Sequence, residues 1–420
     1  MIELISISAR LVLFLTIFLA LDIYTYFGLK SLFNKSKYKQ FYIYLYFFVV
    51  IVSYLGLLNM FLYFRETINS TLISNLLRGF TFSFFIFKLL FILFILLADI
   101  ERILVTVFRF IKQLISKNHK NVNLKSRRKF LTQAGLLIAA IPFSSLLYGI
   151  TKGKYSFNVI KHQLKFKTLP KSFDKFKIVH ISDIHAGSFD SVDKVQKGID
   201  LIQQQNPDII LFSGDLVNND SREIEPYITM FKSLKARFGK FAVLGNHDYG
   251  EYKKWSSDTE KNENFTLLLK HYKHMEFKLL NNTNETITLN NETIQIVGVE
   301  NWGRPPFPKK GDLNLALNGL TDSFKILLSH DPTHWDLEVK NHHTNIDLTL
   351  SGHTHGMQFG VEIPGIKWSP VKYIYPHWAG LYKFKNKYLN VNRGFGFIGF
   401  PGRVGIWPEI TVIELNAENS

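Results

Sequence analysis

Five short segments in the second half of the chain carry Asp, His and Asn side chains that could do chemistry. They are Asp183-Ile184-His185, Gly214-Asp215, Gly245-Asn246-His247-Asp248, Ser329-His330 and Gly352-His353-Thr354-His355. Carboxylate, amide and imidazole donors are typical ligands of divalent cations in proteins. Seven such donors meeting in one place could hold two cations, and a pair of close cations catalyses phosphoester hydrolysis.

The elements that must position these donors are buried strands, because each segment follows an apolar run. The runs are KIVHIS, IILFS, FAVL, KILL and DLTL. In an α/β sheet, ligands collect where the strands end along one edge. The two histidines of Gly352-His353-Thr354-His355 can converge only if the backbone bends, and Gly352 and Gly356 would allow that bend.

Strand and helix patterns alternate after residue 175, which predicts an α/β domain. Apolar residues spaced by three and four predict a helix over 191–205, and further helices are expected over 221–237 and 262–275. Residues 286–300 alternate around Asn290-Asn291-Glu292, a hairpin signal. We expect residues 356–408 to form loops and short strands over the metal edge, and 409–415 to form a closing strand.

Charge is distributed unevenly along the chain. Residues 1–150 carry 17 Lys and Arg against 5 Asp and Glu, and the remaining 270 residues carry 33 against 29. The near-balance of the second part disfavours a nuclease, because proteins that bind nucleic acids neutralise several phosphates with Lys and Arg. The chain has no cysteine, which excludes disulfides and thiolate ligands.

Residues 1–150 are expected to form an all-α transmembrane region, since four apolar stretches approach the roughly 20 residues that cross a bilayer. The expected spans are 9–29, 41–64, 79–98 and 130–150. Residues 151–174 are expected to form a linker and a first strand, and residues 175–420 the catalytic domain.

Three details of the membrane region call for an explanation. Asp22 and Lys88 interrupt two spans, and because a charge inside a span is costly, we expect each to lie near a span end or to pair with a neighbouring helix. The alternative is that they belong to an ion or lipid pathway. Segment 99–117 predicts either a surface helix or an extension of the third span.

The charge of the loops predicts the orientation of the chain in the membrane. Loops 30–40 and 99–129 are rich in Lys and Arg, whereas loop 65–78 holds only Arg65 and Arg78 against Glu66. The positive-inside rule therefore predicts a multi-pass inner-membrane protein whose catalytic domain is periplasmic or extracellular. The hexapeptide Ser126–Leu131, SRRKFL, resembles a twin-arginine export signal, although arginines before an outward-going span also follow from the charge rule alone.

The ordered segments resemble those of the calcineurin-like metallophosphoesterase superfamily over residues 170–415. Residues 352–358 and the closing Arg403 and Pro408-Glu409-Ile410 are most similar to its membrane-associated bacterial phosphodiesterases. The resemblance implies a four-layer α/β/β/α sandwich, here preceded by the all-α transmembrane bundle, and it does not reach residues 1–150.

The resemblance also implies how two divalent ions, Mn, Fe or Zn, would be bound. One ion would be held by Asp183, His185, Asp215 and His355, and the other by Asp215, Asn246, His330 and His353. A hydroxide bridging the ions would attack phosphorus, and His247 would protonate the leaving oxygen. Asp248 would hold the His247 imidazole in the required tautomer.

Other histidine, arginine and aromatic residues are expected outside the ligand set. His180 is expected in the core, and His334, His342 and His343 at the surface. His377 could line the substrate entrance, and Arg403 could contact a substrate phosphate or form a structural ion pair. The aromatic residues near the motifs could form an apolar rim for a lipid or sugar, or core packing under the loops; they are Trp302, Trp368, Tyr373, Tyr375 and Trp378.

The sequence therefore predicts a membrane-anchored binuclear-metal phosphoesterase that hydrolyses phosphodiester or pyrophosphate bonds, with a lipid or lipid-linked substrate of the membrane or envelope. One alternative is a UDP-diacylglucosamine-type pyrophosphatase of lipid A synthesis, whose substrate is cytoplasmic. The other is a non-catalytic membrane sensor with a silent metal domain. No nucleic acid and no protein partner is expected.

Overall fold

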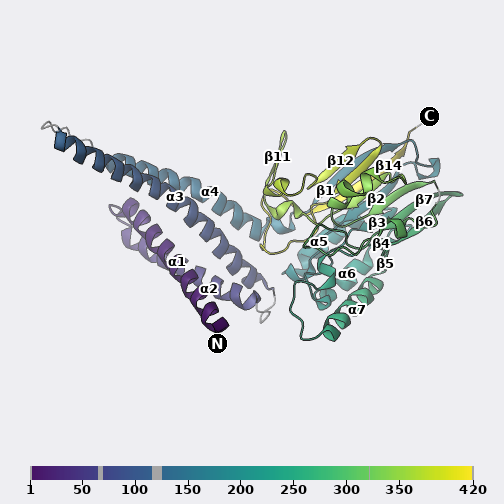
Figure 1. The fold of residues 1–420 in the computed structure, drawn as a ribbon, viewed down its shortest axis with the longest axis horizontal. Helices are drawn as coiled ribbons and strands as arrows, with labels where there is room; N and C mark the ends of the chain where they lie inside the picture. Colours follow the sequence, from purple (N-terminus) through teal and green to yellow (C-terminus); the bar gives the residue numbers. More distant parts are fainter. Residues whose placement is uncertain (1, 65–69, 116–124, 321, 419–420) are drawn as a thin grey trace. The chain divides into compact units, whose positions relative to one another are not determined.

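The computed structural model describes residues 2–64, 70–115, 125–320 and 322–418 (Figure 1). These residues form two compact units that divide near residue 149. The first unit is helical and the second contains all the strands.

Four helices make up the first unit, and each is long and apolar enough to cross a membrane. They are α1 (Ile2–Phe33), α2 (Lys39–Phe64), α3 (Leu72–Ile115) and α4 (Lys125–Thr151). Since α3 continues without a break to Ile115, the segment after residue 98 extends the third span and is not a separate surface helix. The side chains of residues 126–128 lie outside the described part of the chain, so the export signal stays a prediction.

Asp22 and Lys88 pair with each other, which confirms the expectation that each pairs with a neighbouring helix. Lys88 Nζ lies 2.8 Å from Asp22 Oδ1, and both side chains are buried. The Tyr46 hydroxyl donates to the Asp22 carbonyl at 2.6 Å. A charge buried in an apolar helix bundle is costly unless an opposite charge pairs with it, and the Lys88 ammonium also lies over the Phe18 and Phe84 rings.

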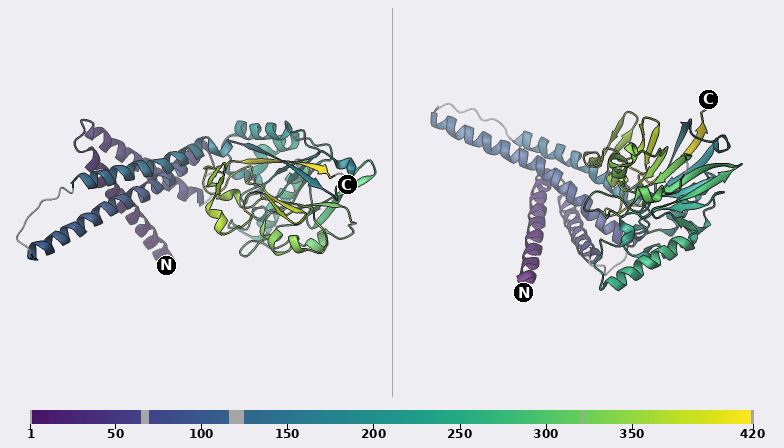
Figure 2. Two further views of the ribbon diagram at one scale, coloured as in Figure 1. Left: turned by 90° about the horizontal axis from the view of Figure 1, so that it is seen from above. Right: turned by 45° about the vertical axis from the view of Figure 1, so that its right-hand side comes forward.

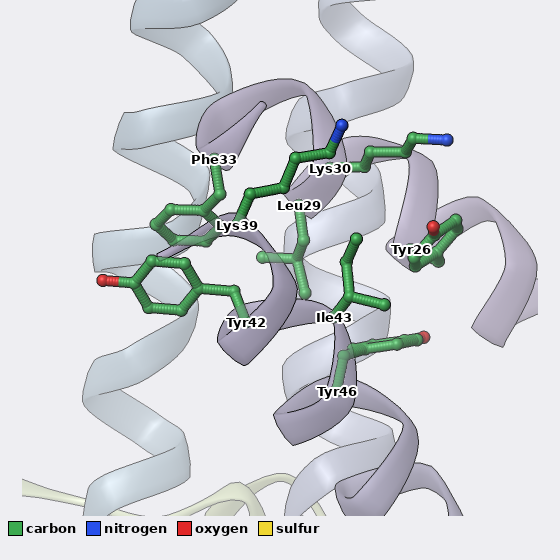
Figure 3. A pocket seen from close by; sticks show the side chains of 8 residues that line it. All are labelled: Tyr26, Leu29, Lys30, Phe33, Lys39, Tyr42, Ile43 and Tyr46. Atoms are coloured by element: carbon green, nitrogen blue, oxygen red, sulfur yellow. The ribbon is translucent and has the colours of Figure 1, made fainter. Parts of the chain in front are cut away.

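A small pocket lies between α1 and α2 (Figure 3). It is lined by Tyr26, Leu29, Lys30, Phe33, Lys39, Tyr42, Ile43 and Tyr46. Its walls are almost wholly apolar and aromatic, and none of the predicted metal ligands contributes to it.

The second unit contains two six-stranded mixed sheets, with strand orders β1-β14-β2-β3-β4-β5 and β12-β13-β9-β8-β7-β6. The strands of the first sheet are β1 (Asn158–Phe166), β2 (Phe176–Ile181), β3 (Ile209–Phe212), β4 (Lys240–Ala242), β5 (Phe277–Leu279) and β14 (Glu409–Ala417). Those of the second are β6 (Thr283–Leu289), β7 (Glu292–Gly298), β8 (Phe324–Leu328), β9 (Leu348–Ser351), β12 (Gly380–Phe384) and β13 (Lys387–Val391). A separate hairpin joins β10 (Val361–Ile363) and β11 (Ile366–Trp368). The predicted hairpin over residues 286–300 is the antiparallel pair β6–β7.

Alternating residues of a strand pack into different hydrophobic cores. In β3, Ile209 and Leu211 enter the core between the sheets, whereas Ile210 and Phe212 face the helices outside. In β8, Ile326 enters the core between the sheets and Leu327 a third core on the far side. Because side chains alternate along a strand, both faces of each sheet are apolar and must be covered.

Helices cover the outer faces and complete four layers, which confirms the predicted α/β/β/α sandwich. Helices α5 (Val192–Gln203), α6 (Ile228–Ser233) and α7 (Asp258–His274) pack on the first sheet, as Figures 1 and 2 show in teal. Helices α8 (Leu313–Ala316) and α9 (Thr333–Leu337) pack on the second. The helix predicted over 221–237 is wrong in extent: a 3₁₀ helix over Ser221–Tyr227 contains Pro226, which cannot donate within a helix, and α6 ends at Ser233.

His180 of β2 is a core histidine, as expected. Its ring is fully buried, with Nε2 2.9 Å from Ser213 Oγ and Nδ1 3.1 Å from Asn390 Nδ2. Burial lowers its pKa to about 4. The ring is therefore neutral in the folded domain at neutral pH.

We predict that His180 makes the domain acid-sensitive. An unfolded histidine titrates near 6.5, so the unfolded chain binds more protons between about pH 6.5 and 4, and the free energy of unfolding falls as pH falls through this window by about 3 kcal/mol. Denaturant unfolding of the detergent-solubilised, chelator-treated chain should show a shallower pH dependence for His180→Gln. The exposed His274→Gln should keep the wild-type dependence; equal slopes in all three proteins would contradict the prediction.

Candidate metal centre

The predicted donors lie just past the ends of five strands. Asp183, Asp215 and Asn246 follow β2, β3 and β4 of the first sheet. His330 and His353 follow β8 and β9 of the second. The parallel arrangement of β2, β3 and β4, and of β8 and β9, brings these ends together.

The first group of donors contains Asp183, His185 and His355. His355 Nε2 lies 3.2 Å from Asp183 Oδ1 and 3.0 Å from His185 Nε2. His185 Nε2 also lies 3.5 Å from Asp215 Oδ2. All four side chains are buried, so their polar atoms face one another and not water.

The second group contains Asn246, His330 and His353. His330 Nε2 lies 3.2 Å from Asp215 Oδ2 and 3.1 Å from Asn246 Oδ1. Asn246 Oδ1 lies 2.8 Å from His353 Nδ1. Because Asp215 Oδ2 approaches both His185 and His330, this carboxylate stands between the two groups.

Outer contacts fix which atom of each donor faces the cluster. His330 Nδ1 donates to the Ser213 carbonyl at 2.7 Å, so that Nε2 faces the cluster. Asn246 Nδ2 donates to the Tyr252 hydroxyl at 3.0 Å, so that its oxygen points inward. His353 uses Nε2 on the Tyr375 hydroxyl at 2.8 Å and presents Nδ1. Such contacts orient metal ligands in proteins.

Five donor residues have left-handed backbone conformations. The φ angles are 51° for Asp183, 48° for His185, 63° for Asp215, 71° for His353 and 50° for His355. Such angles are uncommon outside glycine and cost roughly 1–3 kcal/mol each, and they concentrate at functional sites. The packing of two sheets must hold them in place.

The bend between the last two histidines differs from the expected one. His353 and His355 themselves take positive φ, as does Gly356 at 56°, whereas Gly352 does not. Gly352 is required for another reason, because a Cβ there would lie 1.8 Å from Ser182 Oγ and 2.2 Å from Asp183 Oδ2.

The electrostatics of the cluster suit divalent cations. Burial opposes ionisation of both carboxyl groups, yet His355 lowers the pKa of Asp183, and His330 and His247 hold the pKa of Asp215 well below its usual range. Among the described residues, no Lys or Arg pairs with either carboxylate. A buried set of oxygen and nitrogen donors with two carboxylates fits ions such as Mn, Fe or Zn.

The structure places His247 beside the cluster but does not bear out the role expected of Asp248. His247 Nδ1 donates to the Asn218 carbonyl at 2.7 Å, so this backbone oxygen orients the imidazole. Asp248 instead accepts from the backbone N–H groups of Asp215, Leu216 and Gly245 at 2.8–3.0 Å. Asp248 thereby holds together the loops that carry the donors. Its position next to His247 in the sequence did not predict this role.

Three residues at the cluster were not predicted as its partners. Tyr252 orients Asn246, and Tyr375 orients His353. Asp331 Oδ2 lies 3.7 Å from His353 Nε2 and has no hydrogen-bond partner. Only Asp331 had a sequence signal, because it directly follows His330.

The remaining candidates lie outside the cluster or behind it. His334 is fully buried and stacks on Trp302 at 4.7 Å, so its predicted surface position is wrong. His377 contacts Asp336 at 2.9 Å. Arg403 is fully buried, donates to the Gly396 carbonyl and lies 3.1 Å from His355 Nδ1. It forms no ion pair with the described residues, and its contact with a substrate phosphate stays a prediction.

The remaining surface histidines and aromatic residues agree with the predictions only in part. His342 and His343 are half-buried and exposed, as expected of surface residues. Of the expected aromatic rim, Trp302 and Trp378 are core residues, whereas Trp368 and Tyr373 are exposed.

Two family models match the chain. Residues 8–154 match the model described as a probable calcineurin-like phosphoesterase transmembrane domain. Residues 176–357 match the model of the calcineurin-like phosphoesterase domain, which includes every predicted metal ligand.

Curated relatives agree with both matches. The metallophosphoesterase YkuE of Bacillus subtilis is 31% identical over 70% of this chain and 99% of its own length. The phosphodiesterase YaeI of Escherichia coli is 29% identical over 69% of this chain and 99% of its own length. A zebrafish (Danio rerio) transmembrane protein with a metallophosphoesterase domain is 28% identical over 68% of this chain and 62% of its own length. The chain is thus a membrane protein that belongs to the calcineurin-like metallophosphoesterases.

Proposed function

We propose that the chain is a membrane-anchored hydrolase that cleaves phosphodiester or pyrophosphate bonds with a pair of divalent ions, Mn, Fe or Zn. The observation that carries the proposal is the position of Asp215, whose Oδ2 lies 3.5 Å from His185 Nε2 and 3.2 Å from His330 Nε2. A carboxylate shared by two groups of donors can bridge two cations. The name of the relative YaeI, a phosphodiesterase, supports the same bond type.

The proposed ligands follow the two groups. Asp183, His185, Asp215 and His355 would hold one ion, and Asp215, Asn246, His330 and His353 the other. Bound ions would activate water and neutralise the phosphoryl oxygens. The chain's own part is to fix the donors through Ser213, Tyr252 and Tyr375 and to exclude water from the buried carboxylates.

We infer that His247 gives a proton to the leaving oxygen. Its ring is only partly buried and lies edge-on to His185, with the ring centres 4.9 Å apart. The bond from Nδ1 to the Asn218 carbonyl directs Nε2 away from that carbonyl, and Nε2 can donate when both ring nitrogens carry a proton. Acid assistance of this kind typically contributes roughly 10²–10⁴-fold to a rate.

Asp215→Asn should abolish metal-dependent activity. The purified chain should cleave bis(p-nitrophenyl) phosphate with added Mn, and the variant should lose about 10²-fold or more, the scale lost with one charge-stabilising group of an active site. Its metal content, measured by mass spectrometry, should fall as well. The exposed Asp193→Asn serves as the control. Full activity of the wild type after exhaustive chelation would exclude the metal mechanism, and a folded, metal-loaded chain without activity would favour the sensor.

His247→Asn should lose more activity on a poor leaving group than on a good one. p-Nitrophenolate leaves without a proton, whereas an alkoxide needs one, so the loss should approach about 10²–10⁴-fold only for an alkyl phosphodiester. The measurement is kcat for both substrates at equal metal content. Equal losses on the two substrates would argue that His247 binds substrate and is not the acid.

We also propose that the catalytic domain lies outside the inner membrane. The described residues contain four helices long and apolar enough to cross a membrane, an even number, and Lys30 in the last turn of α1 adjoins a basic loop that holds Lys35 and Lys37. The positive-inside rule places that loop in the cytoplasm. An alkaline phosphatase fused after residue 420 should be active and a green fluorescent protein dark; the reverse result would favour the cytoplasmic UDP-diacylglucosamine-type pyrophosphatase.

A further inference from the structure

Exposed apolar side chains of the second unit concentrate in one short segment. In the described part of residues 149–418, eleven large hydrophobic side chains are exposed, and seven of them lie between residues 357 and 374. They are Met357, Val361, Ile363, Ile366, Trp368, Tyr373 and Ile374. We call residues 361–374 the hairpin surface. A contiguous exposed apolar patch marks a site of interaction with another apolar phase or partner.

The apolar side chains of the hairpin are exposed. Strands β10 and β11 pair with each other, with Val361 opposite Trp368 and Ile363 opposite Ile366. All six strand residues are exposed, and Figure 1 shows the hairpin standing away from the two main sheets. Its other face contacts the domain through polar side chains: Lys367 donates to the Ala379 carbonyl and lies over the Trp378 and Tyr382 rings, and Glu362 pairs with Arg393. A lone two-stranded hairpin is marginally stable in water.

The base of the hairpin, in contrast, is held firmly. Gly360 N donates to the Val404 carbonyl at 2.9 Å, and Ser369 Oγ donates to the Gly356 carbonyl at 2.8 Å. The tip of the hairpin therefore projects from a fixed base. This arrangement is expected of an element whose exposed side chains have a function.

The composition of the hairpin surface is that of a segment at a membrane interface. Trp368 and Tyr373 are aromatic residues of the kind that gather at the level of lipid headgroups, and isoleucines accompany them. Lys372 is exposed beside Tyr373. Glu362 is the single acidic residue between 357 and 374, and Arg393 pairs with it at 2.5 Å. No uncompensated negative charge opposes contact with anionic lipid.

Lipid is also the partner that this chain always has nearby. Helix α4, long and apolar enough to span, ends at Thr151, and β1 begins at Asn158. Only residues 152–157 separate them, so the domain is tethered to the bilayer by a short connection. Tethering raises the effective concentration of the tethered surface and makes a weak contact persist.

The hairpin surface adjoins the candidate metal centre along the chain and in space. It begins shortly after His355, and Tyr375, which directly follows it, contacts His353 at 2.8 Å. We propose that residues 361–374 insert into the headgroup layer of the membrane and hold the metal centre at the lipid surface, where it acts on the phosphate of a lipid. The last clause rests on the proposed function; the insertion does not.

The absence of cysteine makes insertion directly measurable, because a single cysteine can be labelled. The full chain is reconstituted in phosphatidylethanolamine–phosphatidylglycerol vesicles with an environment-sensitive nitrobenzoxadiazole dye on Ile366→Cys or on Leu315→Cys. These positions are matched, being 53% and 55% exposed. At residue 366 we expect at least twofold quenching by spin-labelled lipid and little by aqueous iodide, and the opposite at residue 315.

Two results would overturn the insertion. One is quenching by iodide at residue 366 as strong as at residue 315. The other is protection from iodide without quenching by spin-labelled lipid, varying with protein density, which would assign the hairpin surface to contact between copies of the chain. Neither readout depends on catalysis, so an inactive protein leaves this test intact.

The second part of the proposal is tested by kinetics. The double variant Ile363→Ser with Ile366→Ser should lose at least tenfold on a phosphodiester lipid embedded in vesicles and stay within twofold of wild type on soluble bis(p-nitrophenyl) phosphate. Leu315→Ser should match wild type on both. Equal rates on the lipid, or equal losses on both substrates, would overturn a role in substrate access, whereas a wild type inactive on both would contradict the proposed function alone.

Discussion

The constraint on which the second unit depends is the burial of two carboxylates, Asp183 and Asp215, without a Lys or Arg partner among the described residues. An isolated charge in the interior of a protein is strongly unfavourable. Histidine and amide donors surround both groups, and the outer atoms of His330, Asn246 and His353 are bonded to Ser213, Tyr252 and Tyr375. These three donors therefore present their remaining polar atoms to the cluster, an arrangement that favours bound cations.

Holding this cluster takes both sheets. Four donors, Asp183, His185, Asp215 and Asn246, follow strands of the first sheet, and three, His330, His353 and His355, follow strands of the second, so neither sheet alone has a complete set. The apolar core between the sheets fixes their separation, and the left-handed residues at the strand ends turn the side chains inward. Asp248 ties the loops after β3 and β4 together through three backbone N–H groups. Packing energy thus maintains strained backbone at the site.

Much of this arrangement could be predicted from the sequence because the signals are local. Apolar runs followed by Asp, His or Asn identified the strands, and alternation around Asn290 identified the β6–β7 hairpin. The predictions that were wrong depended on contacts between segments that are distant in the sequence. The Asn218 carbonyl replaced Asp248 as the partner of His247, and Trp302 buried His334, because sequence spacing does not report which loops meet.

Element ends and exposed surfaces were also beyond local patterns. Pro226 divided the helix expected over 221–237, although the apolar spacing continued past it. The exposure of Val361, Ile363, Ile366 and Trp368 could not be predicted either, because an alternating apolar hairpin has the same pattern whether it packs on a core or projects from it.

The position of β14 has a consequence for biosynthesis. This strand follows every other strand in the chain, yet it lies between β1 and β2, parallel to the first and antiparallel to the second. Until residues 409–417 have left the ribosome, β1 has no neighbour and β2 lacks one of its own. The helices that precede residue 149 can enter a bilayer while translation continues, but the sheet that supplies Asp183, Asp215 and Asn246 closes only after residues 409–417 have been made.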